Sequence, residues 1–162
     1  MGAASVKQDE LRQFLTAFAA ERLALLQRHE AGARAVSNYD FNNTYQYVIA
    51  REETQLTWLR NALGELGATL PAPSSTQSVP DASRAVLDDD ARQLGAFVEK
   101  WRDRVAGMTH ARHRIMLDVI LGESLEHQRL FEQAAAGFED VLGRRTGGVA
   151  RVGGVLPTRW IE

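Results

Sequence analysis

Hydrophobic residues recur every three or four positions along most of this chain, which is the pattern of helices with one buried face. Three of the four prolines fall between residues 70 and 80 and the fourth is Pro157, so the periodic stretches lack the residue that breaks helices. The pattern predicts four helices over about residues 6–35, 41–66, 82–106 and 109–142. The fold class is therefore all-α.

The segments between these stretches indicate how the helices are joined. Ser37–Asp40 offers capping side chains, and Gly67 stands where a glycine commonly ends a helix. Asp81 or Ser83 is the expected cap of the third helix, and Thr109 that of the fourth. The polar connection from Leu70 to Pro80 is long for a bundle loop and suits a crossover between the second and third helices. We expect an antiparallel four-helix bundle; the alternative is two hairpins that complete their core by dimerising.

Composition and charge narrow the possible functions. The 162 residues suit one domain, with the bundle in residues 1–143 and a glycine-rich tail in 144–162. A net charge of −2 creates no field to hold nucleic acid or anionic lipid. The chain has no cysteine, which excludes disulfides and thiolate chemistry, and no apolar run as long as a membrane span. We expect a cytoplasmic protein.

Polar residues interrupt the apolar faces at one common height. Counting from the two short turns places Glu21 opposite Glu52 and Glu53, and brings Ser124 and His127 close to the same level. Polar groups on a buried face are costly unless they are paired, so several interruptions at one level are informative. The sequence predicts a small polar island at mid-height in the core.

Two segments resemble a known family. Residues 50–68 (AREETQLTWLRNALGELGA) and 120–134 (ILGESLEHQRLFEQA) are similar to the second and fourth helices of rubrerythrin-type and related bacterial ferritin-like proteins. The resemblance implies a ferritin-like bundle and a di-iron or di-manganese site, built from a Glu on each of two helices and a Glu-x-x-His on the other two. Glu21, Glu53 and His127 match ligand positions of that pattern.

Other ligand positions hold residues that do not suit a metal. Leu56 replaces the histidine of the second helix, Ser124 replaces the glutamate of the fourth, and the third helix has Leu94 and Gly95 at this level. Three outcomes stay open: no functional metal, one ion held by Glu21, Glu53 and His127 or by a rearranged set, and a working dinuclear site. The possible substitute ligands are Glu52, Glu123 and Glu126. Without metal, Glu53 or Glu21 would pair with His127 as a buried hydrogen-bonded cluster.

Further features carry weaker signals. His110 and His113 are a possible metal pair but favour an exposed turn, and His29 favours a charge near a helix end. The acidic run 88–90 lacks the spacing of a calcium loop and indicates helix-dipole compensation. In the tail, Leu156, Trp160 and Ile161 either pack on the bundle or a dimer partner, or form a docking peptide.

The incomplete ligand set decides the functional hypothesis. It favours a non-catalytic binding or structural module that forms a homodimer and has no cofactor, rather than an enzyme. The first alternative is an iron- or manganese-binding oxidoreductase or iron-handling protein that uses a rearranged site. The second is a scaffold or cargo protein recruited through its C-terminal tail.

Overall fold

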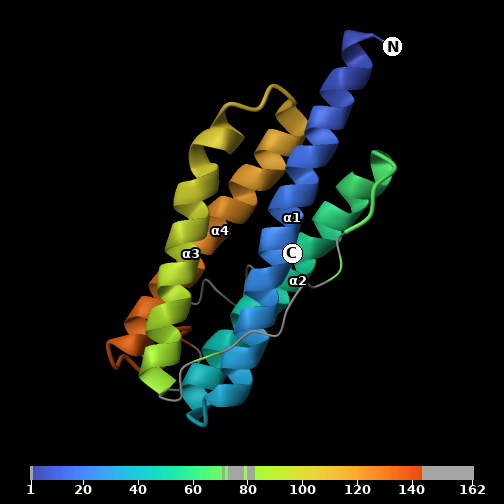
Figure 1. Ribbon diagram of the computed structural model, residues 1–162. Coiled ribbons are helices and arrows are strands. Elements are labelled where there is room, and N and C mark those ends of the chain that lie inside the picture. Colours follow the sequence, from blue (N-terminus) through green and yellow to red (C-terminus); the bar gives the residue numbers. More distant parts are fainter. Residues whose placement is uncertain (1, 71, 73–78, 80–82, 144–162) are drawn as a thin grey trace.

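The computed structural model describes residues 2–70, 72, 79 and 83–143, and all the regular structure in these residues is helical. This confirms the predicted fold class. The four helices, shown in Figure 1, are α1 (Ala3–Ala35), α2 (Tyr39–Glu65), α3 (Ser83–Ala106) and α4 (Ala111–Ala135).

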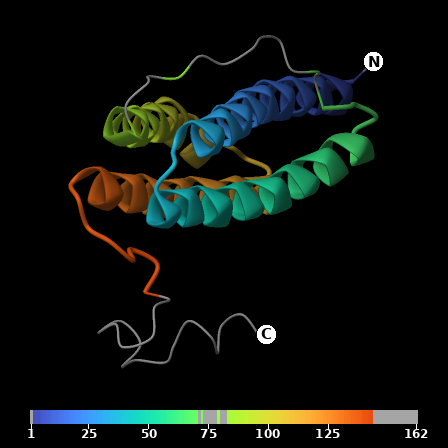
Figure 2. The same ribbon diagram turned by 90° about the horizontal axis from the view of Figure 1, so that it is seen from below.

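The helices form two antiparallel hairpins that pack side by side. α1 lies against α2 and α3, while α4 lies against α2 and α3 (Figure 2). Ion pairs from Glu21 to Lys100 and from Arg28 to Asp90 show that α1 and α3 run in opposite directions. Because α1 is antiparallel to both α2 and α3, these two helices run the same way. The connection between them therefore joins opposite ends of the bundle, as the crossover prediction requires.

Local sequence explains two of the helix ends. The side chain of Asn38 accepts a hydrogen bond from the backbone N–H of Phe41 at 3.1 Å and caps α2. At the other end of α2, Gly67 adopts a φ of 72°, and the N–H of Ala68 bonds to the carbonyl of Leu63 at 2.9 Å. This is a Schellman motif, in which glycine is favoured because its φ is positive.

The fourth helix differs from its predicted bounds. It begins after His110, whose ring accepts the N–H of His113, so His110 rather than Thr109 is the cap. It ends at Ala135 instead of near residue 142, because Gly137 adopts a φ of 99° and the N–H of Phe138 bonds back to the carbonyl of Gln133. Phe138, which the predicted helix would have included, is 65% exposed as a result.

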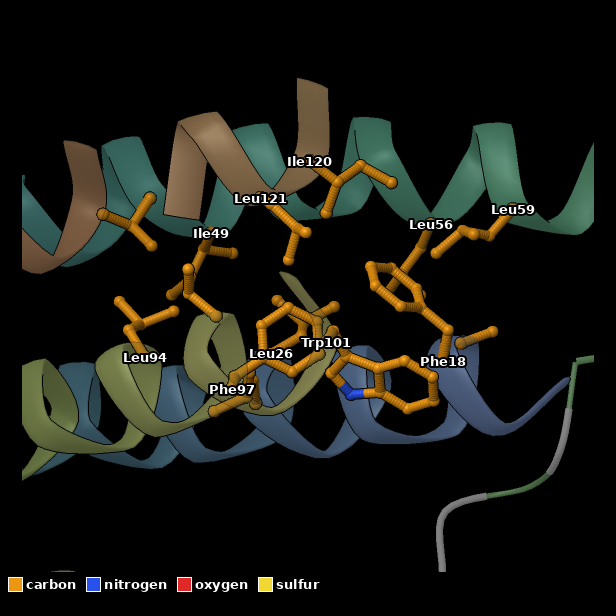
Figure 3. Packing of buried hydrophobic residues seen from close by; sticks show 14 of the residues in the cluster. Phe18, Leu26, Ile49, Leu56, Leu59, Leu94, Phe97, Trp101, Ile120 and Leu121 are labelled. Carbon is orange, nitrogen blue, oxygen red and sulfur yellow. The ribbon is translucent and has the colours of Figure 1, made fainter. Parts of the chain in front are cut away.

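The apolar core holds residues from all four helices (Figure 3). Trp101 of α3 is fully buried in this core, with its ring 5.3 Å from that of Phe14 and 5.2 Å from that of Phe18. A second aromatic contact joins Tyr45 to Phe131 at 4.9 Å, further along the bundle. In the described residues, no helix combines the length and the apolar composition that crossing a membrane requires.

Candidate functional site

A buried arginine and a buried glutamate form the centre of a polar cluster near the middle of α1 and α2. Neither Arg22 nor Glu52 has any solvent-exposed surface. Nε of Arg22 donates a hydrogen bond of 2.8 Å to Oε1 of Gln55. Nη2 of Arg22 lies 3.1 Å from Oε2 of Glu52. This contact is an ion pair but not a hydrogen bond, because neither atom has a hydrogen-bond partner among the described residues.

Two histidines complete the cluster. Nδ1 of His29 donates to Oε1 of Glu52 at 2.5 Å, so both oxygens of this carboxylate face a neighbour. His127 of α4 is 1% exposed, and its ring lies edge-on to that of Tyr47 at 6.1 Å. Its Nδ1 has no hydrogen-bond partner in the described part of the chain. The carboxylate of Glu52 thus joins α2 to α1 through Arg22 and His29, and it interacts electrostatically with His127 of α4.

Burial and the neighbouring charges set the ionisation of these groups. Burial alone would raise the pKa of Glu52, but the charges of His29 and Arg22 outweigh it and hold the pKa below its usual value. Burial lowers the pKa of His127 to about 4, against a smaller opposing effect of Glu52. Burial also lowers the pKa of Arg22, although an arginine keeps its proton at neutral pH. The core therefore holds a charged Arg22–Glu52 pair beside a neutral His127.

A second buried carboxylate, that of Asp90, lies further along the bundle. Asp90 of α3 accepts hydrogen bonds from the hydroxyl of Tyr45 and from Nε of Arg28, the latter at 3.0 Å. Burial raises the pKa of Asp90, and its side chain has no exposed surface. Arg28 also pairs with Asp89, which is partly exposed. The predicted role of residues 88–90 as simple dipole compensation is therefore wrong for Asp90, which is a core residue.

The predicted principal ligands do not come together. Glu21 is partly exposed and pairs with Lys100 of α3 at 2.8 Å, on the outside of the bundle. Glu53 is exposed, and the adjacent Glu52 takes the inward position. Of the three matched residues, only His127 lies in the core. The predicted pairing of Glu53 or Glu21 with His127 is corrected to a pairing of Glu52 with His29.

The remaining predicted residues divide in the same way. Glu123 is engaged by Arg51 through two hydrogen bonds of 2.7 and 3.0 Å, and Glu126 lies exposed beside Arg129 at 3.3 Å. Ser124 is buried and donates to the carbonyl of Ile120 at 2.7 Å. Leu56 and Leu94 are core residues, as predicted. The tail residues Leu156, Trp160 and Ile161 lie outside the described residues.

Sequence reasoning missed Arg22 and Gln55, and it interpreted His29 as a charge near a helix end. Arg22 follows Phe18 by four residues and precedes His29 by seven, so it lies on the buried stripe of α1 by helical spacing. Gln55 stands three residues after Glu52 and shares its face. His29 was assigned to a helix end, but it is fully buried. In each case the helical spacing indicated a buried position, but the polarity of the residue argued against one.

The histidine pair at the start of α4 is a capping arrangement. Nδ1 of His113 lies 2.9 Å from Nδ1 of His110, which also accepts the backbone N–H of His113. His113 is buried, and burial lowers its pKa, with His110 as the next cause. His110 is exposed, as predicted, whereas His113 is not.

Comparison with known proteins bears on the fold. No protein-family model matches the sequence, and no curated protein matches it. A solved structure titled as a ferritin-like, diiron-carboxylate protein from Bacillus anthracis str. Ames superposes with a TM-score of 0.68. The match covers 83% of this chain and 99% of that chain at 15% sequence identity. The fold is ferritin-like. This confirms the architecture that the resemblance implied, and at this identity it shows the fold alone.

The donor set of this ferritin-like core does not fit the dinuclear metal centre that such a fold implies. Within the described residues, no three His, Asp or Glu side chains come together in an arrangement that could hold a metal ion. At the centre, the Glu52 carboxylate already faces His29 and Arg22. A dication about 4 Å from the guanidinium would meet a repulsion of roughly 8 kcal/mol at an effective dielectric constant of about 20. Arg22 and a metal therefore exclude each other.

Proposed function

We propose that this protein is a ferritin-like bundle that acts as a non-catalytic structural or binding module rather than as a di-metal oxidase. The observation that carries the proposal is the ion pair between Arg22 and Glu52 in the centre of the core. The mid-level carboxylate and a permanent cation neutralise each other there. The charge that a metal would supply to this carboxylate is already provided by the chain.

The surrounding residues support the same function. A dinuclear centre needs carboxylates that bridge two ions, and Leu94 of α3 and Ser124 of α4 offer none at this level. The carboxylates of Glu21 and Glu123 are held outside the core by Lys100 and Arg51. A rearranged site would have to break these pairs as well as the central one.

We also propose that the module forms a homodimer. Three large apolar side chains on the outer side of α4 support this: Ile115, Val119 and Leu125 are 60%, 45% and 47% exposed. Light scattering coupled to size-exclusion chromatography tests the assembly state. A monomer at all accessible concentrations would contradict the dimer without affecting the proposal about the core.

Aerobic loading with Fe(II), followed by elemental analysis of the desalted protein, tests the non-catalytic role. We expect iron well below one ion per chain and a rate of Fe(II) oxidation equal to that of buffer. Stoichiometric iron together with Fe(II) oxidation, both lost in Glu52→Gln, would establish the alternative of a rearranged metalloenzyme. Glu53→Gln is the matched control, because that neighbouring glutamate is exposed.

A further inference from the structure

The polar cluster keeps several potential metal donors that Arg22 holds out of use. Glu52, His29 and His127 are each at most 1% exposed. Oε2 of Glu52, Nε2 of His29 and Nδ1 of His127 have no hydrogen-bond partner among the described residues. Two imidazoles with carboxylate oxygen are donors that suit mononuclear zinc, iron, cobalt or manganese. Glu52 contacts both Arg22 and His29, and His127 interacts electrostatically with Glu52 and Arg22, but in the described residues these donors do not form a metal-binding group.

The guanidinium of Arg22 makes few of the hydrogen bonds of which it is capable. Of its three nitrogens, only Nε has a hydrogen-bond partner in the described chain, the side-chain oxygen of Gln55. It also forms the ion pair with Glu52 and lies near the ring of Phe97, whose centroid is 5.5 Å from the guanidinium carbon. Unmade hydrogen bonds are costly in a core. The property of Arg22 that suits this site is therefore its positive charge, which faces the carboxylate of Glu52, rather than its capacity for hydrogen bonds.

We infer that Arg22 is a tethered cation in the place of a metal ion, and that replacing it with a carboxylate makes the core bind one divalent cation. The substitution Arg22→Glu lowers the charge of the cluster by two units, which one divalent ion restores. It also adds a carboxylate from α1 to a set that already holds Glu52 from α2 and His127 from α4. The inference rests on the proposed function, because it requires that the wild-type core takes no metal.

Titration with Co(II) tests the inference, since the visible absorption of cobalt reports nitrogen and oxygen ligands directly. We expect Arg22→Glu to bind one Co(II) per chain. Its melting temperature should rise by about 5–10 °C at a free-metal concentration about 100 times Kd. If the variant is unfolded without metal, Co(II) should restore its helical circular dichroism. Wild-type protein should give neither the absorption nor the shift.

Three further variants define the site. Arg22→Met removes the positive charge of Arg22 without adding a ligand, and Arg129→Glu makes the two-unit charge change of Arg22→Glu on the exposed face of α4; neither should bind Co(II). The double variant with Arg22→Glu and His127→Ala should lose at least tenfold in affinity. Arg22→Asp, which adds the same carboxylate on a shorter side chain, serves if the glutamate variant fails to fold.

The outcomes separate the inference from the proposed function. Stoichiometric Co(II) in wild-type protein would overturn the proposed function and the inference together. An Arg22→Glu protein that is folded but shows no response to Co(II) would overturn the inference alone. The same conclusion would follow if Arg22→Glu stays unfolded with Co(II) and Arg22→Asp also fails to bind it.

Discussion

Nη2 of Arg22 and Oε2 of Glu52 lie 3.1 Å apart with no solvent access to either side chain. This contact joins α1 to α2 at the level where the ferritin-like fold would place metal. Taking two charges out of water is costly, so the attraction between them adds little net stability to the fold. It makes the core dependent on both partners being present.

Removing one partner should therefore be more damaging than removing both. Arg22→Met leaves the Glu52 carboxylate buried without its permanent counter-charge, and we expect a loss of about 3–5 kcal/mol in the free energy of unfolding. The double variant with Arg22→Met and Glu52→Leu should regain part of that loss, because it removes the unpaired charge but leaves His29 and Gln55 without their buried partners. Equilibrium unfolding in urea measures both values.

A surface pair provides the control for this cycle. Arg129 and Glu126 lie 3.3 Å apart on α4 with side chains that are 65% and 53% exposed. Arg129→Met should change the free energy of unfolding by about 0–1 kcal/mol. A loss at Arg22 no larger than this would show that the central pair is not required by the core.

The free energy of unfolding should decrease as the pH is lowered from 6.5 to 4, because of His127. Its pKa is lowered to about 4 in the folded protein, from an ordinary value of 6.5. In this range the unfolded chain binds the proton and the folded core does not, so lowering the pH favours unfolding by up to about 3 kcal/mol. Urea unfolding of wild-type protein at several pH values measures the slope.

The variant His127→Leu isolates this contribution. This variant should retain the pH dependence of stability that comes from the other groups. One of them is Asp90: because its pKa is raised in the folded protein, it lowers the stability as the pH rises above the ordinary pKa of an aspartate. Relative to His127→Leu, the wild-type protein should therefore lose up to about 3 kcal/mol of stability as the pH falls from 6.5 to 4. Identical pH profiles for the two proteins would rule out a buried neutral His127.

The hydroxyl of Tyr45 should stabilise the bundle through Asp90. Tyr45→Phe removes the hydrogen bond donated to a buried carboxylate that burial already disfavours in its charged form. We expect a loss of about 1–3 kcal/mol. Tyr39→Phe, at a site that is 75% exposed, should be close to neutral. Equal effects of the two variants in urea unfolding would contradict this role of Tyr45.

Two glycines of the fourth helix region should respond to alanine with opposite signs. Gly137 adopts a φ of 99°, and an added Cβ would lie 2.9 Å from the guanidinium of Arg84, so Gly137→Ala should lose at least about 1 kcal/mol. Gly122 lies within α4 with open space around it, so Gly122→Ala should gain about 0.5–1 kcal/mol. Thermal unfolding of the two variants measures both; a stabilised Gly137→Ala would contradict the helix end described here.

The helices could be predicted from the sequence because their apolar stripes are long and free of proline. The end of α4 could not, since Val141 and Leu142 continue the apolar spacing beyond the glycine that ends the helix. What decides the end is the positive φ of Gly137, and Gly143 offered an equally suitable residue. Periodicity locates a stripe, whereas backbone conformation sets where it stops.

The candidate site was harder to predict, because adjacent residues differ by about 100° around a helix. The pattern placed a glutamate of α2 in the core but matched Glu53, whereas Glu52 faces inward. Arg22 was overlooked because arginine is rarely buried without a partner, and its partner was identified only with the orientation of Glu52. The polar island itself was predicted correctly, but which of the two adjacent glutamates of α2 lies in it depends on a shift of one residue along the helix.

Anomalous diffraction at the iron edge, from crystals soaked anaerobically in Fe(II), tests the central claim most directly. If Arg22 takes the place of a metal, the map should show no iron peak within coordination distance of Glu52, and the guanidinium should remain beside the carboxylate. An iron peak bound by Glu52 and His127, with Arg22 displaced from the core, would contradict the account.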